Sequence, residues 1–524
     1  MPRRRLLIIA VPLAVLALGL AAWQFLPIQT EAFLERLFPW SESFPKQPYV
    51  QDAGPTAMTI FYVANDPGQG VVQYTTGRHF DRTAPAELHE KIQNAQSTTC
   101  LYRARLESLT PATPYKYRVV HASQGKKVKS RIATFRTWPE KGRPATFIVY
   151  GDTWSAPELH AVMARQFEQY HPDFIVHTGD IISAHDPYEQ WERKFFEPLE
   201  PVLGSKPVMV VRGNHDPQGH DFLRWFELPG DRTWYSFTCG AVHVAVLDCY
   251  DYTPEVARWL DQDLAASQSP WKIVAYHEPT FNFGGHVSHW GRDLLPILAK
   301  HDVDLVLAGH SHGYERFVPL RLNASSPHAT TFVTTAGGGA ELYAVVQHPL
   351  LLKAASLYHY CVVQADAGRL TMRALTPKGE EIDPWTVAKT DGRLDATYLA
   401  QAKPVEAAIL AEALVQASAV SVAGVKDQPD EADVAVRVQL PGLFEPATLS
   451  ARLADSCAGD YKANAASATV NPGTDGVLKI KIRRLSGAPQ SKEAPGEAVL
   501  NVTIRVGAVE QSAPFKMAWP KTAP

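Results

Sequence analysis

The sequence predicts an α/β protein with a β-rich segment on either side. Five short apolar runs in the middle of the chain each end in a polar cluster that contains aspartate, asparagine or histidine. Buried strands that end in such side chains are typical of α/β folds, which bind ligands at the carboxyl edge of the sheet. Segments with helical spacing separate these runs, and period-two alternation marks both flanks. We therefore expect a central α/β domain between two β domains.

Size and composition limit the classes of function. The 524 residues suggest roughly three or four domains, and a hydrophobic share of 45% is ordinary for a globular protein. The net charge of -3 gives no reason to expect a nucleic acid as a partner, and no protein partner can be inferred. The five cysteines lack metal-type spacing; a Cys239–Cys249 disulfide and buried free thiols are both open.

Residues 1–25 predict a transmembrane anchor or a signal peptide. Three arginines, Arg3 to Arg5, precede an apolar stretch over residues 6–22. Its length is close to the roughly 20 residues that span a bilayer, and the arginines favour a cytoplasmic N-terminus. Small residues around Gly19 suit a cleaved signal equally well. In either case we expect the rest of the chain on the extracytoplasmic, periplasmic side of the cell envelope, either membrane-anchored through this segment or secreted.

Residues 45–138 predict a β-sandwich. The expected strands cover residues 58–63, 70–74, 100–106 and 109–119. A turn cluster at residues 65–68 separates the first two strands. The segment 109–119 resembles a fibronectin type III strand pair, and we expect this domain to be structural rather than a binding module.

Residues 144–385 carry the five polar clusters and predict the α/β domain. Helical spacing is expected over residues 157–170, 188–203, 254–266 and 290–300. The clusters contain Asp152, Asp180, the run Asn214, His215 and Asp216, then His277, and finally His310 and His312. A single strand-end aspartate is usually a cap or turn residue, and a single histidine is usually structural. Five clusters in series, each with an oxygen or imidazole donor, instead indicate a metal site.

The order of these clusters resembles the metallophosphoesterase (calcineurin-like phosphoesterase) family, in particular its purple acid phosphatase-like branch. The matching blocks are Gly151-Asp152, Gly179-Asp180, Gly213-Asn214-His215-Asp216, Val274-Ala275-Tyr276-His277 and Gly309-His310-Ser311-His312. The resemblance covers residues 50–380. It implies a four-layer α/β/β/α sandwich with two mixed sheets, and an N-terminal fibronectin type III-like domain is frequent in this branch. We expect residues 331–335 and 360–363 to be strands of the second sheet.

The resemblance also implies a role for each residue of the blocks. Asp180 would bridge two divalent or trivalent transition metal ions, which oxygen and imidazole donors allow to be iron, manganese or zinc. Asp152 and His312 would complete one site, and Asn214, His277 and His310 the other. His215 would face the substrate as a phosphate contact or proton donor. Asp216 would accept a hydrogen bond from its ring and favour the charged imidazole.

The implied activity is hydrolysis of a small phosphoester by direct attack of a metal-bound hydroxide. Two cations a few ångströms apart suit this chemistry, because they bind the anionic ester and make hydroxide available near neutral pH. Phosphodiesterase or nucleotidase activity at the same site is an alternative. A different class of function is a metal- or phosphate-binding envelope protein without turnover.

Two positions depart from the family pattern. Ser183 stands where purple acid phosphatases have a tyrosine ligand, and Trp154 stands where many other metallophosphoesterases have a histidine. One metal site is therefore a ligand short, and water, His185 or Tyr188 are the candidates to complete it. His286, in the loop after the fourth block, is either a substrate-facing residue or a solvated one.

The remainder of the chain carries no active-site motif. Residues 386–428 are alanine-rich, and the stretch 402–423 is either a helix or a linker. Alternation with period two over residues 433–440, 477–482 and 499–504 predicts a C-terminal β-sandwich across 429–524. Its function is not indicated by the sequence.

Overall fold

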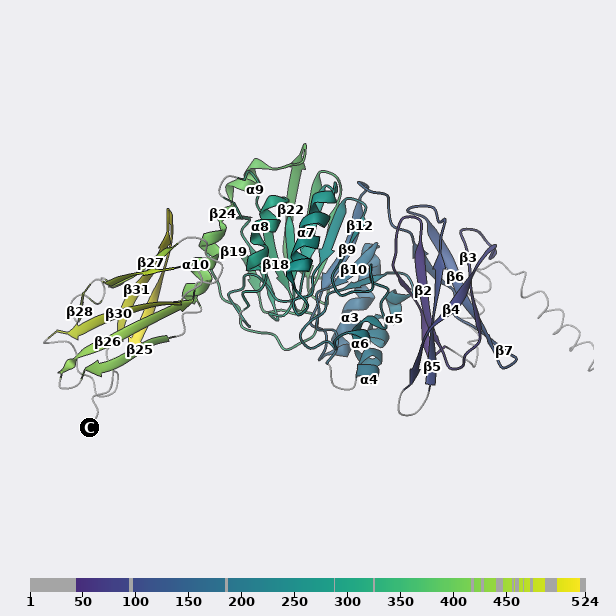
Figure 1. Ribbon diagram of the computed structural model, residues 1–524, viewed down its shortest axis with the longest axis horizontal. Coiled ribbons are helices and arrows are strands. Elements are labelled where there is room, and N and C mark those ends of the chain that lie inside the picture. Colours follow the sequence, from purple (N-terminus) through teal and green to yellow (C-terminus); the bar gives the residue numbers. More distant parts are fainter. Residues whose placement is uncertain are drawn as a thin grey trace, which may run out of the picture.

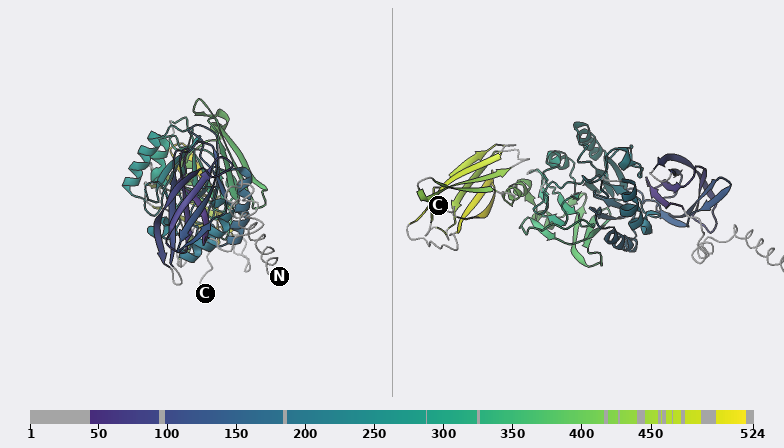
Figure 2. Two further views of the ribbon diagram at one scale, coloured as in Figure 1. Left: turned by 90° about the vertical axis from the view of Figure 1, so that its right-hand side faces the viewer. Right: turned by 90° about the horizontal axis from the view of Figure 1, so that it is seen from below.

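The computed structural model shows three bodies in a row, with a β-sandwich on either side of a central α/β body (Figures 1 and 2). It describes residues 44–93, 98–183, 187–286, 288–323, 326–415, 419–425, 428–439, 446–454, 457, 461–464, 466–471, 475–485 and 497–518. The expected anchor or signal, residues 1–25, lies outside this range. Among the residues described, no helix has both the length and the apolar character needed to cross a bilayer.

The N-terminal body is the expected β-sandwich. Its strands are β1 (Lys46–Gln51), β2 (Met58–Ala64), β3 (Gln69–Thr75), β4 (Arg82–Gln93), β5 (Thr98–Leu106), β6 (Pro114–Ser123), β7 (Lys126–Lys129) and β8 (Ala133–Arg136). Strand β4 pairs with both β5 and β3 and so joins the two faces. Between the faces lie buried aromatic rings such as Tyr62 and Tyr102, stacked at 5.1 Å. The Tyr49 hydroxyl donates to the Trp225 carbonyl and ties this sandwich to the central body.

The first sheet of the central body contains the strands that precede the first three polar clusters. Its order is β11 (Val208–Val210), β10 (Phe174–His177), β9 (Ala145–Tyr150), β20 (Tyr360–Ala365), β21 (Arg369–Leu375), β22 (Glu381–Thr390) and β23 (Arg393–Leu394). Strands β9, β10 and β11 are parallel, whereas β20 runs antiparallel to β9. The expectation that residues 360–363 belong to the second sheet is wrong: this apolar strand pairs with β9, where it covers the open edge of an equally apolar strand.

The second sheet contains the strands that precede the last two clusters. Its order is β12 (Tyr235–Cys239), β13 (Val242–Val246), β14 (Trp271–Ala275), β15 (Leu305–Ala308), β18 (Thr331–Thr335), β16 (Tyr314–Phe317) and β19 (Leu351–Ala355). The placement of residues 331–335 in this sheet is confirmed. Because side chains alternate along a strand, Ile273 packs in the core shared with the first sheet, while Val274 packs in a second core with Leu260 of an outer helix.

Helices cover the outer faces of the two sheets and give the expected α/β/β/α layers. They are α3 (Pro157–Phe167) with a 3-10 turn (Glu168–Tyr170), α4 (Pro187–Trp191), a π-helical turn (Glu192–Phe196), α5 (Glu197–Leu203), α6 (His220–Leu223), α7 (Pro254–Ala266), a 3-10 turn (Arg292–Leu294) and α8 (Leu295–Lys300). Helix α7 begins where the sequence predicts, since Pro254 opens it and the Thr253 hydroxyl accepts a hydrogen bond from the Val256 amide.

The C-terminal part starts with α9 (Ala396–Ala400), β24 (Lys403–Pro404), which pairs with β17 (Leu320–Arg321), and α10 (Val405–Val415). The sandwich that follows has one sheet of β25 (Ala419–Val425), β26 (Gln428–Gln439), β30 (Asp475–Arg484) and β28 (Tyr461–Ala463), and another of β29 (Ala466–Val470), β27 (Ala447–Leu453), β31 (Glu497–Val506) and β32 (Val509–Ala518). The alanine-rich stretch thus contains a helix over residues 405–415 and a strand over residues 419–425. Cys239 and Cys249, like the other three cysteines, are free thiols.

Candidate metal centre

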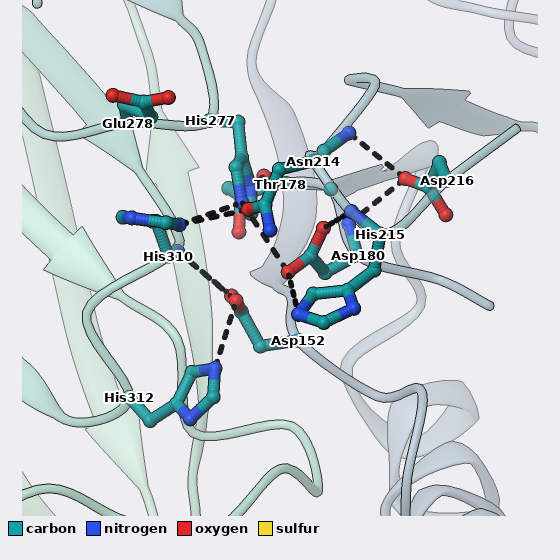
Figure 3. A network of polar contacts seen from close by, with 12 residues as sticks. Asp152, Thr178, Asp180, Asn214, His215, Asp216, His277, Glu278, His310 and His312 are labelled. Atoms are coloured by element: carbon teal, nitrogen blue, oxygen red, sulfur yellow. Dashed lines mark hydrogen bonds and ion pairs between the residues drawn. The ribbon is translucent and has the colours of Figure 1, made fainter. Parts of the chain in front are cut away.

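The five polar clusters meet at the carboxyl ends of β9, β10, β11, β14 and β15, where loops from both sheets converge (Figure 3). The structure brings together all six side chains that the sequence analysis selected as metal ligands. They fall into two groups that share one member.

The first group consists of Asp180, His277 and His310, whose ligand atoms lie within 4.8 Å of one another. Asn214 extends it, because its Oδ1 lies 3.1 Å from His277 Nε2 and 2.9 Å from His310 Nδ1. Two imidazole nitrogens, an amide oxygen and a carboxylate therefore converge on one point, as Figure 3 shows.

The second group consists of Asp152, Asp180 and His312, again with ligand atoms within 4.8 Å of one another. His312 Nε2 lies 3.5 Å from Asp152 Oδ1. Asp180 belongs to both groups, which is the position that a bridging carboxylate needs.

Backbone carbonyls fix which nitrogen of two histidines is available. His277 Nδ1 lies 2.9 Å from the Thr178 carbonyl, and His312 Nδ1 lies 2.7 Å from the Glu341 carbonyl. A carbonyl only accepts hydrogen bonds, so Nδ1 carries a proton in each ring, and in the neutral form of the ring Nε2 has the free lone pair. In each ring that Nε2 faces a carboxylate of the site. This is the usual way in which a protein orients a metal-binding imidazole.

Three of the candidate ligands have a left-handed backbone. The φ angles are 62° at Asp152, 55° at Asp180 and 65° at His310. Such conformations cost residues other than glycine about 1–3 kcal/mol and collect at functional sites. The loops that carry Asp180 and Gly213 also approach each other closely. A Cβ at Gly213 would collide with Asp180 Oδ1, so only glycine fits there. The turns are thus shaped to point these side chains inward.

The buried carboxylates of the centre are stable in their charged form only beside a positive charge. Burial, together with the neighbouring Asp180, raises the pKa of Asp152 well above its usual range, although His277 acts in the opposite direction. Burial opposes ionisation of Asp180 too, but the charge and hydrogen bond of His277 lower its pKa to about 2. Despite the burial of its ring, Asp180 and Asp152 raise the pKa of His277 to about 10. A cation would fit here, because it would compensate the carboxylates in place of these protons.

Asp216 does not take the expected position beside the ring of His215. Its carboxylate accepts hydrogen bonds from the backbone amides of Asp180, Ile181, Ile182 and Gly213, at 2.8–3.0 Å. The side chain is buried and lies between the loops that follow β10 and β11. Asp216 therefore holds the Asp180 loop in place, and its expected contact with His215 is corrected.

The imidazole of His215 stacks on an aromatic ring instead. Trp154 lies against it with ring centroids 4.5 Å apart and 19° between the planes. His215 Nε2 lies 3.9 Å from Asp180 Oδ2, and 40% of the side chain is exposed. The ring therefore stands at the open side of the metal groups, where a substrate can reach it.

The second ligand group has three members in the part of the chain that the structure describes. At the two positions that depart from the family pattern, the Ser183 amide donates a hydrogen bond to Gln190 Oε1, and the Trp154 ring stacks on His215. His185 lies outside the described residues, and the side chain of Tyr188 is also outside them. Which group completes this site stays a prediction.

Three side chains at the rim were not foreseen from the sequence. Tyr343 stacks on His312 at 4.4 Å, and the Tyr250 hydroxyl lies 3.5 Å from Asn214 Oδ1. Glu278 directly follows His277 and accepts a hydrogen bond from the Ser288 hydroxyl at 2.7 Å. Glu278 adjoins a block and was accessible to sequence reasoning, but the two tyrosines follow no motif. His286 lies near this rim, with its ring 5.6 Å from that of His310.

Comparison with known proteins shows which families the chain resembles. The chain matches the calcineurin-like phosphoesterase family over residues 145–314 and the purple acid phosphatase N-terminal domain over residues 45–137. Purple acid phosphatase 21 of Arabidopsis thaliana is 27% identical over 333 residues, which are 56% of this chain and 72% of the relative. Purple acid phosphatase 18 of the same plant is 27% identical over 337 residues, 58% and 74% of the two chains.

Among solved structures, "GAP50 the anchor in the inner membrane complex of Plasmodium" aligns with 49% of this chain and 93% of its own. The identity is 18% and the TM-score is 0.40.

Proposed function

We propose that this chain, which belongs to the calcineurin-like phosphoesterases and carries the N-terminal domain of purple acid phosphatases, hydrolyses small phosphoesters at a two-metal centre. The chief support is the position of Asp180, which belongs to both ligand groups. A shared carboxylate sets two cations close together, as phosphoester hydrolysis requires.

The donor set fits two transition metal ions. Asp152, Asp180 and His312 would hold one of them, and Asp180, Asn214, His277 and His310 the other. Oxygen and imidazole donors suit iron, manganese and zinc. When bound, the pair of cations would neutralise the charge of the ester and make hydroxide available near neutral pH.

The residues of the chain would then orient the ester and supply a proton. His215 is exposed beside Asp180, and Trp154 limits the rotation of its ring. An imidazolium in this position would donate a proton to the leaving oxygen or hold a phosphoryl oxygen. Asp216 would hold the loops after β10 and β11 together, because its carboxylate accepts hydrogen bonds from backbone amides of both.

A second candidate function is suggested by the second ligand group, which has three members among the described residues. If the cation held by Asp152 and His312 is lost readily, the protein would bind metal or phosphate without turnover. Phosphodiesterase and nucleotidase activities are further alternatives that use the same centre.

Metal content and turnover test the proposal together. We expect close to two transition ions per chain by elemental analysis, and loss of most of both in Asp180→Ala, because that residue belongs to both groups. The control Asp221→Ala removes a half-exposed carboxylate away from the centre and should keep both ions. Turnover is measured on alkyl and aryl monoesters, diesters and nucleotides. Hydrolysis by metal-free wild-type protein would refute the two-metal centre, and a fully loaded protein inactive on every ester would favour the binding function.

A further inference from the structure

A single buried acidic residue lies at the junction between the central body and the C-terminal sandwich. Glu412 is on α10, which Figure 1 shows between the two bodies, and its side chain is 0% exposed. The neighbouring residues on the helix, from Ala407 to Leu414, are apolar and buried. A carboxylate in such a setting needs specific partners, because burial of an unpaired charge is costly.

Both carboxylate oxygens of Glu412 have partners in the central body. Oε2 forms an ion pair with Arg292, which is itself 3% exposed. Oε1 accepts a hydrogen bond from the backbone amide of Asn282 at 2.9 Å. His289 lies 3.6 Å from Oε2, but burial and the charge of Arg292 lower its pKa to about 4, so it is neutral near pH 7. The C-terminal helix is therefore anchored to the start of the loop that follows the His277 block.

Asn282 determines the path of that loop from inside. Its Nδ2 donates to the carbonyls of Gly284 and His286, at 2.8 and 2.7 Å, and its Oδ1 accepts from the Ser288 amide at 3.3 Å. The side chain is fully buried. One amide group thus links the backbone of residues 284, 286 and 288, and Glu412 fixes the backbone from which this amide projects.

The closed loop adjoins the metal centre at two points. The Gly284 carbonyl accepts a hydrogen bond from the hydroxyl of Ser311, the residue between His310 and His312, at 2.7 Å. The His286 ring lies 5.6 Å from the His310 ring and 5.1 Å from the Tyr343 ring. Gly285 has no room for a side chain, because a Cβ would lie 2.4 Å from Ser311 Oγ. The loop therefore presents His286 at the rim in a defined position.

We infer that Glu412 is a positioning residue, through which the C-terminal helix places His286 to contact a phosphoryl oxygen at the centre. The inference rests on one part of the proposed function, the binding of a phosphate group at the centre, and does not depend on turnover. It gives the C-terminal part of the chain a role in substrate binding, although that part carries no active-site motif.

The first test replaces Glu412 by glutamine, which keeps the shape but removes the charge. We expect faster hydrogen exchange of the amides in residues 282–288 and an about tenfold higher Kd for inorganic phosphate on the metal-loaded full chain, the usual scale for a lost hydrogen bond to a charged group. Metal content should not change. Glu406→Gln, on the same helix, is the matched control and should resemble the wild type. In case E412Q alone fails to fold, the pair E412Q and R292Q leaves no unpaired buried charge.

A double-mutant cycle separates positioning from general destabilisation. In a His286→Ala background, Glu412→Gln should raise the Kd for phosphate by less than twofold, because the residue through which it acts is gone. Equal effects in both backgrounds would overturn the inference, as would a phosphate Kd that does not change in either Glu412 variant. The readouts need no turnover. A wild type that binds phosphate but hydrolyses no ester would refute the proposed function and leave this inference standing.

Discussion

The indole of Trp154 stands at a position where the family resemblance leads us to expect a histidine ligand, and it stacks on His215. An indole nitrogen is a donor without a lone pair for a cation, so Trp154 cannot serve as the expected ligand. The stacked rings, 4.5 Å apart, restrict the imidazole in return. If the proposed function holds, Trp154 orients the acid group of the site and does not contact a metal.

His215→Ala should retain both metal ions and lose roughly 100-fold or more in turnover on alkyl phosphates, the usual scale for general acid catalysis. The loss should be smaller on aryl phosphates, since their leaving groups depart without a proton. Steady-state kinetics over a series of leaving groups measures this. The same loss on every ester would show that His215 binds the phosphate and donates no proton.

Trp154→Ala should lower turnover by about three- to tenfold, because an aromatic stack of this kind contributes roughly 0.5–1.5 kcal/mol. Trp154→Phe keeps a ring at the same place and should recover most of the activity. Metal content is measured in parallel and should stay at the wild-type value in both variants. A fall in bound metal in Trp154→Ala would mean that the indole supports the ligand loops instead.

The loops after β10 and β11 behave as one element because Asp216 joins them. Each of its oxygens accepts two backbone amides, and the side chain is 3% exposed. Burial, with the nearby charge of Asp180, raises its pKa to about 7. The four amides act against this shift, since they favour the charged form. The geometry of Asp180 and Asn214 depends on this carboxylate.

Asp216→Asn should destabilise the protein by about 2 kcal/mol or more. An amide offers one acceptor oxygen and one NH₂ group, so two backbone amides lose their acceptor in either orientation. Metal retention should fall as well, because both ligand loops are released. Denaturant unfolding and elemental analysis measure the two effects, with Asp221→Asn as the exposed control. Unchanged metal affinity would show that the loops hold their shape without Asp216.

Acid should weaken the whole central body through its buried neutral histidines. Burial lowers the pKa of both His160 and His359 to about 4. Their pKa in the unfolded chain is higher, near the ordinary value of about 6.5. The stability that each contributes is therefore fully present above pH 6.5 and is lost as the pH falls toward 4.

The expected loss is about 3 kcal/mol for each histidine between pH 7 and pH 4, from the 1.36 kcal/mol that corresponds to one pKa unit. Urea unfolding at a series of pH values measures it. His160→Gln should be less stable than the wild type at pH 7 but should lose less stability on acidification. Parallel pH profiles for the two proteins would contradict this assignment.

Features with a local cause were predictable from the sequence, and features with a distant cause were not. The start of α7 follows from Thr253 and Pro254, and the six candidate ligands follow from motifs at strand ends. The sheet that receives β20 depends on its pairing with β9, far upstream in the chain. The expected partner of Asp216, the His215 ring, was wrong. Asp216 accepts hydrogen bonds from backbone amides of another loop. Every residue except proline has such an amide, so the side chains of that loop do not indicate the contact.

Glu412 lies between these extremes. A lone acidic residue within an apolar helical run is a visible sign of a buried charge, and α10 contains just such a run. What the sequence does not reveal is its partner, since Arg292 and the Asn282 amide belong to a different domain. This contact depends on how the two domains pack against each other, which the sequence near Glu412 does not indicate.

The place of β9 in its sheet has a consequence for biosynthesis. One edge of β9 pairs with β10, which follows soon after it, but the other edge pairs with β20, which the ribosome makes only after the whole second sheet. Until then, a largely apolar strand next to Asp152 has an open edge, which is a template for association with other chains. A nascent chain that ends just after His312 holds every candidate ligand and still lacks this strand. We therefore expect that a chain must extend through β20, and not only to the last motif, before it can load metal.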